Sequence, residues 1–360
     1  MVCYDGQWYP PNNVCIKLCP ALSFPNSVFE CTVNGEPVSC ERNMQPRTVA
    51  TRTCKSGYRD ESHNAPNICK DNGEWEYKHI DCYTDCGVID RDYQSNNTEY
   101  DDLLTFPWKA GLYMKKGDSN DFEFICSATL LETGNVITAA SCVKDSNGSL
   151  INSDLLRVGL GKSYMPWNDP RDIHAQKFEV TRASDGYLHA LVIGNQISKF
   201  KKSLELFEPL SFIFMKGAVD LSAFTRAICI DSIGSNSKIE FLEGEIFGWD
   251  RDGNHVSYNI TLYTNDYCKT LIFNLRNRDA ELEKEIMEFG RFCTDRALPD
   301  TLYGSSVMYY DEGEKVFNLV GVLISVHESI SIFQGLRDRE ASQALLHYYN
   351  NLISLVAEKQ

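Results

Sequence analysis

The stretch CSATLLETGNVITAASC, residues 126 to 142, has a cysteine at each end and places Ser141 immediately before the second one. From Cys86 onward, strand-like runs of about six to eight residues recur with Gly, Asn and Asp between them, and this stretch belongs to that pattern. The pattern predicts an all-β barrel or sandwich domain. The function of this domain depends on what Ser141 does at this position.

Composition limits the possible answers. The chain has 360 residues, of which 43% are hydrophobic, and 14 are cysteines. This is enough apolar material for roughly two or three compact units. Several cysteines have short, regular spacings, which indicates a disulfide framework and an oxidising, extracellular setting. Zinc sites usually contain paired Cys-x-x-Cys or Cys/His clusters. Because none occurs here, we expect neither a metal nor a cofactor.

Charge, hydropathy and acceptor sequons also bear on the setting. A formal charge of −15 argues against nucleic acid and anionic membranes as partners. No apolar run approaches the roughly 20 residues that span a bilayer. Three Asn-x-Ser/Thr sequons agree with secretion. The start MVCYDGQW is no signal peptide, so we expect a fragment of a longer secreted precursor whose upstream modules are missing. The sequons predict glycosylation at Asn96, Asn147 and Asn259.

The first 82 residues contain an internal repeat. CYDGQWYPPNNVC (residues 3–15) and CKDNGEWEYKHIDC (residues 69–82) share a cysteine, an acidic-Gly turn, a tryptophan and a closing cysteine. Together with the Cys-Pro at residue 19 and CKSGY at residues 54–58, the second copy resembles the sushi, or complement control protein, module. Two crossed disulfides would staple this small unit around one tryptophan. We therefore expect a sushi module at residues 18–83.

The sushi resemblance implies the disulfides Cys19–Cys69 and Cys54–Cys82. Two further cysteines lie in CTVNGEPVSC, whose Asn-Gly between apolar residues is a hairpin signature, so we pair Cys31 with Cys40. Residues 1–17 would be the C-terminal remnant of a truncated module. The pairing of Cys3 and Cys15 and the segment before them stay open.

Several pieces of the remaining chain resemble trypsin-like serine proteases of the chymotrypsin fold. They are FPWKAGLY (106–113), residues 126–142, LLRVGLGK (155–162), AFTRAICI (223–230), EGEIFGWD (243–250), CKTLIFN with GRFCTD (268–274, 290–295) and FNLVGVLISV (317–326). The resemblance implies a linker at 84–104, derived from an activation region, and a protease-like domain at 105–360. It also implies the disulfides Cys86–Cys229, Cys126–Cys142 and Cys268–Cys293.

The expected fold is thus mostly β: a disulfide-stapled sushi module followed by a chymotrypsin-like double β-barrel with a C-terminal helix. SQALLHYYNNLISLVAEK (342–359) predicts that helix. NRDAELEKEIMEF (277–289) predicts a second helix or a charged surface excursion.

The catalytic residues of the family are not found at the matching positions. Serine proteolysis requires a hydroxyl nucleophile, a base, an acid that orients the base, and donors to the oxyanion. Ser141 stands where the family has its histidine, and Pro209 where it has its aspartate; Glu208 is adjacent. In LPDTLYGSSVMYY (298–310), alignment on the glycine after the nucleophile gives Tyr303. Alignment on the glycine before it gives Ser306, with Ser305 as a further alternate.

The activation sequence is also missing. The family is cut after a basic residue before Ile-Val-Gly-Gly, whereas Arg91 is followed by Asp and Tyr. Loss of the nucleophile or base alone lowers turnover by about 10⁶-fold. Rescue by another histidine would require several coincidences. We therefore expect no ordinary protease activity; the histidines weighed are His174, His189, His255, His327 and His347.

A rigid barrel without catalysis is suited to protein recognition. The domain order resembles the arthropod modular serine proteases of Toll and melanisation cascades, and also haptoglobin. The resemblance implies a secreted, non-catalytic regulator whose partners are cascade proteases and pattern-recognition proteins. Two alternatives remain: an extracellular carrier of haptoglobin type, and an active serine endopeptidase with unconventional chemistry.

Overall fold

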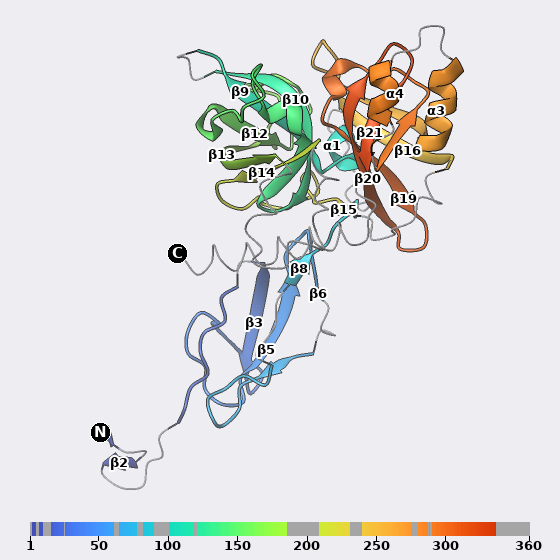
Figure 1. Cartoon of the computed structure of the whole chain (residues 1–360). Helices are drawn as coiled ribbons and strands as arrows, with labels where there is room; N and C mark the ends of the chain where they lie inside the picture. Colours follow the sequence, from blue (N-terminus) through green and yellow to red (C-terminus); the bar gives the residue numbers. More distant parts are fainter. Residues whose placement is uncertain are drawn as a thin grey trace, which may run out of the picture. The chain divides into compact units, whose positions relative to one another are not determined.

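The computed structural model describes residues 2–4, 7–9, 16–24, 26–60, 65–77, 82–89, 101–117, 121–185, 209–230, 240–274, 280–286, 288 and 290–335 (Figure 1). The chain forms two compact units, Met1–Asp85 and Cys86–Gln360.

The first unit is built from short antiparallel strands. Its largest sheet has four strands in the order β4-β3-β5-β7. The β3–β4 hairpin turns at Asn34 and Gly35, whose φ angles of 52° and 86° suit a tight hairpin turn. The remaining strands form two-stranded pairs. The bounds are β1 (Val2–Tyr4), β2 (Gln7–Tyr9), β3 (Ser27–Val33), β4 (Glu36–Val38), β5 (Val49–Cys54), β6 (Tyr58–Asp60), β7 (Asn67–Ile68) and β8 (Cys82–Thr84).

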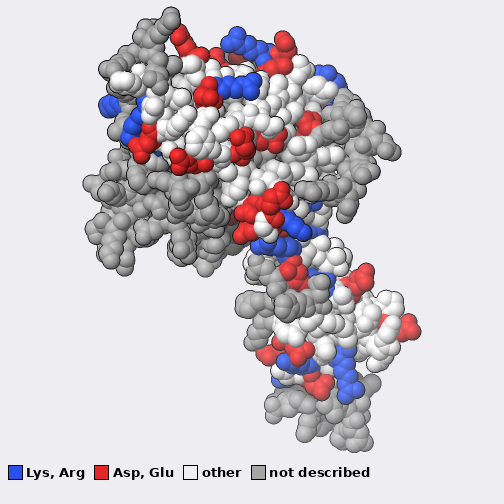
Figure 2. All heavy atoms as spheres, turned by 90° about the vertical axis from the view of Figure 1, so that its right-hand side faces the viewer, with Lys and Arg blue, Asp and Glu red and all other residues white. Residues whose placement is uncertain are grey.

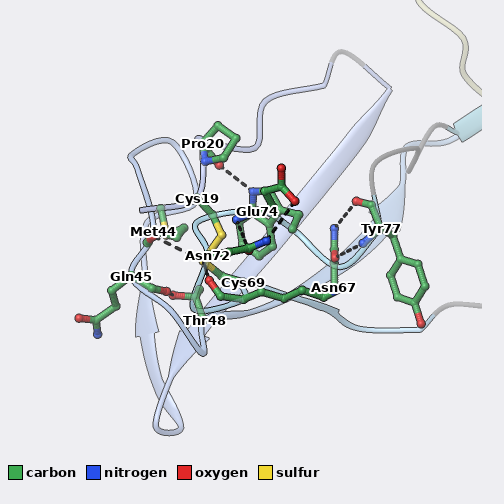
Figure 3. The surroundings of a disulfide bond; sticks show 12 residues. Cys19, Pro20, Met44, Gln45, Thr48, Asn67, Cys69, Asn72, Glu74 and Tyr77 are labelled. Carbon is green, nitrogen blue, oxygen red and sulfur yellow. Dashed lines mark hydrogen bonds between the residues drawn. A yellow bond between two sulfur atoms is a disulfide. The ribbon is translucent and has the colours of Figure 1, made fainter. Parts of the chain in front are cut away.

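A disulfide and a tryptophan fill the small core of this unit. Cys19 is bonded to Cys69, and both are buried with Trp75 in one cluster. The indole N–H of Trp75 donates to the carbonyl of Pro20 at 2.8 Å, and Cys19 exchanges two backbone hydrogen bonds with Met44. Figure 3 shows Pro20 and Met44 beside the Cys19–Cys69 disulfide. The unit also contains the disulfides Cys31–Cys40 and Cys54–Cys82.

The second unit contains two closed six-stranded antiparallel barrels, which confirms the expected chymotrypsin-like fold. The first, green in Figure 1, has the order β10-β11-β14-β13-β12-β9, and the ring closes between β9 and β10. Its strands are β9 (Lys109–Lys115), β10 (Phe122–Glu132), β11 (Asn135–Ala139), β12 (Leu156–Leu160), β13 (Gln176–Asp185) and β14 (Leu210–Met215).

The second barrel, orange and red in Figure 1, has the order β20-β19-β16-β17-β18-β21. Pairing of β20 with β21 closes the ring, and β15 (Cys229–Ile230) adds to β20 in parallel. Its strands are β16 (Leu242–Trp249), β17 (His255–Thr264), β18 (Arg291–Thr294), β19 (Ser306–Asp311), β20 (Val316–Val326) and β21 (Ser331–Gly335).

Few helices occur among the described residues. They are α1 (Asp101–Thr105), α3 (Asn265–Asn274), α4 (Ala280–Ile286) and the 3-10 turns η2 (Ala140–Val143), η3 (Ser153–Leu155) and η6 (Asp300–Leu302). Helix α4 confirms a helix within the predicted stretch, over Ala280–Ile286, and it is no surface excursion because Leu282 and Ile286 are buried in the core. Helix α3 was not predicted. The helix expected at 342–359 lies outside the described residues. None of the helices described is long and apolar enough to cross a membrane.

One hydrophobic cluster contains side chains from both barrels, and a second cluster lies within the second barrel. The rings of Phe106 and Phe247 stack with centroids 5.0 Å apart, and the indole of Trp108 reaches the sulfur of Met308 at 3.2 Å. The unit contains the disulfides Cys86–Cys229, Cys126–Cys142 and Cys268–Cys293. Packing between the barrels and these disulfides therefore fixes the positions of residues at the boundary between the two barrels.

Candidate functional site

Ser141 is the only exposed residue of a short, buried turn. Every residue of β11 is buried, and the chain then bends into η2, where Ala140, Cys142 and Val143 are also buried. The Cys126–Cys142 disulfide fixes this turn to β10. The turn therefore directs the side chain of residue 141, and no other, toward solvent.

Tyr303 meets Ser141 from the other barrel. It follows η6, and its carbonyl accepts the backbone N–H of Ser127 at 2.9 Å. Its phenolic oxygen lies 2.8 Å from the hydroxyl oxygen of Ser141, and either group can be the donor. The structure therefore brings together the residues expected at the base and nucleophile positions, although they are 162 positions apart in the chain.

Pro209 supports the same turn through its backbone. Its carbonyl accepts the N–H of Ala140 at 2.7 Å, next to the paired residues Ala139 and Leu210. Proline has no ionisable side chain, so this position can hold the turn in place but cannot orient a base. Glu208 lies outside the described residues.

Gly304 allows the two loops to approach closely. Its φ angle is +80°, and a Cβ atom there would lie 2.2 Å from Thr138 Oγ1 and 2.5 Å from the carbonyl oxygen of Ser127. Only glycine tolerates both the left-handed backbone and this contact. Gly304 thus determines how near Tyr303 comes to Ser141.

The two serines after Gly304 are turned into the core. Ser305 and Ser306 are both 0% exposed. The hydroxyl of Ser305 donates to the carbonyl of Phe247, and the hydroxyl of Ser306 has no hydrogen-bond partner among the described residues. Neither hydroxyl can reach a substrate in this arrangement.

Backbone donors near Tyr303 are used within the protein. The N–H groups of residues 302 to 305 donate, in order, to the carbonyls of Pro299, Asp300, Leu323 and Leu302, at 2.8 to 3.0 Å. An oxyanion hole needs N–H groups aimed at an empty position. These four N–H groups are therefore not available for that purpose.

The ionisation of Tyr303 also disfavours nucleophilic chemistry. Burial raises the pKa of its phenol above the usual value near 10, and the hydrogen bond from Ser141 opposes this only in part. The phenol is therefore neutral at physiological pH. A neutral phenol beside a neutral hydroxyl has no base to remove its proton.

His327 is the histidine that most nearly forms a catalytic arrangement. Its Nε2 lies 3.0 Å from the hydroxyl of Ser325 and 3.3 Å from a carboxylate oxygen of Glu285 on α4. A proton relay uses one ring nitrogen for the hydroxyl and the other for the acid. Here both contacts fall on the same nitrogen, so the three residues form a polar cluster rather than a relay.

The other described histidines have different contacts. His174 stacks on Phe224 with ring centroids 3.7 Å apart. His255 Nδ1 lies 3.0 Å from the ammonium group of Lys109, and its pKa is lowered to about 4, mainly by burial and then by the Lys109 charge. Both contact residues other than Ser141 and Tyr303. His189 and His347 lie outside the described residues.

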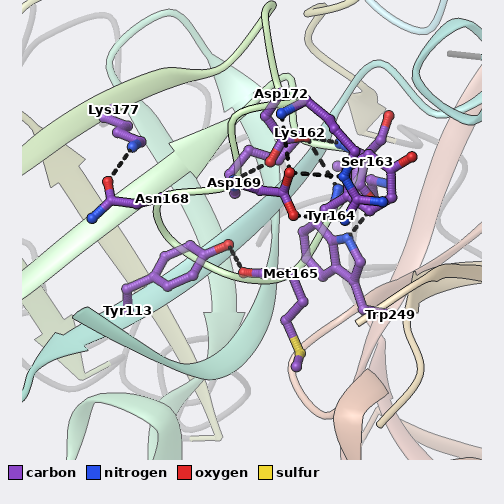
Figure 4. A network of polar contacts seen from close by, with 12 residues as sticks. Tyr113, Lys162, Ser163, Tyr164, Met165, Asn168, Asp169, Asp172, Lys177 and Trp249 are labelled. Atoms are coloured by element: carbon purple, nitrogen blue, oxygen red, sulfur yellow. Dashed lines mark hydrogen bonds and ion pairs between the residues drawn. The ribbon is translucent and has the colours of Figure 1, made fainter. Parts of the chain in front are cut away.

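A polar network that the sequence did not reveal surrounds the segment before β9. The ammonium of Lys109 pairs with Asp102 at 2.6 Å, and Asp102 accepts the hydroxyl of Ser163 at 2.9 Å. Lys162 and Asp172 form a second ion pair that is almost completely buried (Figure 4). The indole of Trp249 donates to the Ser163 carbonyl at 2.8 Å. Through Asp102, these contacts connect α1 to Lys109 at the start of β9 and to Ser163.

Two of the three glycosylation sequons lie among the described residues. Asn147 and Asn259 are both exposed, the first in a turn and the second on β17; Asn96 lies outside the described residues. Among the residues that the structure describes, no group of three or more His, Cys, Asp or Glu could hold a metal ion.

Comparison with known proteins adds to this geometry. The Trypsin family model matches residues 96–281. A modular serine protease of Drosophila melanogaster is 25% identical over 258 residues, which cover 67% of this chain and 38% of that protein. Clotting factor C of Tachypleus tridentatus is 27% identical, covering 42% of this chain and 17% of its own length. A protein of Xenopus tropicalis named inactive serine protease PAMR1 is 27% identical over 49% of this chain and 29% of its own length. The chain therefore spans well under half the length of these relatives.

Proposed function

Because the chain belongs to the trypsin family of serine proteases, we propose that it is a secreted, non-catalytic member of that family, which acts by binding other proteins of an extracellular protease cascade. The observation that carries this proposal is the 2.8 Å contact between the hydroxyls of Ser141 and Tyr303. Two neutral hydroxyl groups occupy the place where proteolysis needs a base and a nucleophile.

Further features support an inactive site. Pro209 offers only a carbonyl to the Ser141 turn, and the N–H groups of residues 302 to 305 donate to carbonyls within the protein. Because nucleophile, base and oxyanion donors act as a unit, loss of any one removes most of the rate. One relative is named an inactive serine protease and another a modular serine protease, so family membership alone does not decide whether this chain is active.

Secretion is supported by the six disulfides seen among the described residues and by the extracellular kind of protein found among the relatives, such as a clotting factor. We assign the first unit to the sushi class, since crossed disulfides enclose one buried tryptophan there. Among the described residues visible in Figure 2, Lys and Arg side chains lie among Asp and Glu and form no extended basic patch. Protein partners, such as cascade proteases and recognition proteins, fit this surface better than nucleic acid.

Affinity capture tests the binding role. The purified chain would be immobilised, exposed to cell-free extracellular fluid, crosslinked and analysed by mass spectrometry. Enrichment of a serine protease zymogen or a pattern-recognition protein is expected, relative to an immobilised unrelated barrel of the same charge. Enrichment only of proteins that carry haem or other small molecules would favour the haptoglobin-type alternative. Retrieval of no protease or recognition protein would count against the cascade role.

A further inference from the structure

An exposed cluster of aromatic rings lies at one end of the second barrel. Phe241 precedes β16, Tyr263 is near the end of β17, and Tyr267 is in the first turn of α3. Their ring centroids are 4.7 to 5.8 Å apart, with Tyr263 and Tyr267 stacked and Phe241 edge-on to both. Phe241 is 55% exposed and Tyr267 38% exposed. We call these three residues the aromatic cluster.

The backbone at Phe241 is held in an unfavourable conformation. Its φ angle is +59°, in the left-handed region that bulky residues rarely adopt. Such a conformation typically disfavours folding by about 1–2 kcal/mol for a residue other than glycine. Because more than half of the ring is exposed, little core packing compensates for this. Strained residues with exposed side chains are concentrated at binding sites.

Acidic groups surround the aromatic cluster. Asp295 accepts the phenolic O–H of Tyr263 at 3.3 Å, and Glu243 accepts the hydroxyl of Thr261 on the same strand at 3.0 Å. Glu240 directly precedes Phe241 and is exposed. Among the described residues, no cation pairs with these three carboxylates or lies over the rings. A fourth acidic residue nearby, Asp266 on α3, forms an ion pair with Lys269 at 2.8 Å. The surface thus combines aromatic faces with uncompensated negative charge.

We propose that the aromatic cluster is a docking site for an arginine side chain presented by a basic segment of a protein partner. Aromatic faces attract cations, and arginine stacks on them while its guanidinium bonds nearby carboxylates. Aromatic residues that remain exposed in the free protein are common centres of protein interfaces. This proposal gives a partner chemistry to the proposed binding function and rests on it.

Peptide titration followed by NMR tests the proposal. The probe is a short acetylated peptide with two arginines separated by glycines, and its analogue has citrulline in place of arginine. We expect the arginine δ-CH₂ protons to shift upfield through the ring current of the cluster. Phe241→Ala should weaken binding at least threefold, in line with one cation–π contact. Phe273→Ala is the matched control, because Phe273 is also exposed (59%) and lies on another face of α3; it should leave binding unchanged.

The proposal is overturned if the citrulline peptide binds equally well, or if Phe241→Ala binds like the natural chain. A stability measurement separates a binding role from a structural one. Phe241→Gly relieves the left-handed strain, so its melting temperature should be unchanged or raised by a few degrees, while peptide binding is lost. A large drop in melting temperature would show that the ring serves the fold instead. A negative peptide result would contradict the docking proposal but not the proposal that the site is non-catalytic, so failure of one can be distinguished from failure of the other.

Discussion

The hydroxyl of Ser141, on a disulfide-tied turn of the first barrel, lies 2.8 Å from the phenolic oxygen of Tyr303, which comes from the second barrel. The groups that meet between the two barrels at this point are a pair of mutually hydrogen-bonded hydroxyls. If the site is non-catalytic, as we propose, the contact should contribute only to stability.

Ser141→Ala and Tyr303→Phe should each lower the free energy of unfolding by about 0.5–1.5 kcal/mol, the net value of one hydrogen bond. Because both remove the same bond, the double variant should lose little more than either single one. Urea denaturation of the natural chain and the three variants provides the free energies for a double-mutant cycle. Additive losses would mean that the hydroxyls do not interact.

Gly304→Ala should lower the free energy of unfolding by about 3–5 kcal/mol, since left-handed strain adds to overpacking against Thr138 and Ser127. Gly148→Ala is the control, because Gly148 has a similar φ of +78° but nothing within 4 Å of an added Cβ. It should lose only about 1–2 kcal/mol. Equal losses in the two variants would argue that the contact between the loops is unimportant.

The stability of the second unit should fall in mild acid. The pKa of His255 is about 4 in the folded protein, against the ordinary histidine value of 6.5, so the unfolded chain binds the proton more tightly. This contribution is complete above about pH 6.5, is lost progressively as the pH falls, and is gone below about pH 4; it amounts to about 3 kcal/mol at most.

His255→Gln tests this contribution, with denaturation followed from pH 7 to pH 4. The variant should lose less stability over this range than the natural chain. His174→Gln is the control, because His174 is also partly buried and its pKa is also lowered by burial. Parallel pH profiles for the natural chain and His255→Gln would contradict the assignment.

The chain expressed in secretory cells should carry glycans at Asn147 and Asn259, because both side chains are exposed. Endoglycosidase should increase its electrophoretic mobility, and replacing either asparagine by glutamine should remove one step of the shift. An unshifted secreted chain would show that these sequons are unused.

The double barrel could be expected from the sequence because strands, turns and cysteines occur in the order of a known family. The cysteine pairs seen in the structure are those that the two resemblances and the Asn-Gly hairpin led us to expect. The positions of Ser141 and Tyr303 followed from alignment alone. Their hydrogen bond did not, because alignment gives positions and not side-chain directions.

Other features depended on contacts that a sequence does not display. The alternates Ser305 and Ser306 are both fully buried, which their positions in the sequence do not reveal. The contact of His327 with Glu285 needed the placement of α4, which the sequence suggested only as a helix or an excursion. Helix α3 was not predicted, because the one signal in its sequence was Cys268, which indicates a disulfide and not a helix. The aromatic cluster joins residues from two strands and a helix, which no local pattern links.

Covalent labelling with a fluorophosphonate probe tests the central claim most directly. The intact mass of the probe-treated chain would be measured beside that of an active trypsin-family protease treated identically. The account predicts no added mass on this chain and complete modification of the active protease. Stoichiometric modification of a serine, at Ser305, Ser306, Ser325 or elsewhere in the barrels, would show a functional nucleophile and contradict the account.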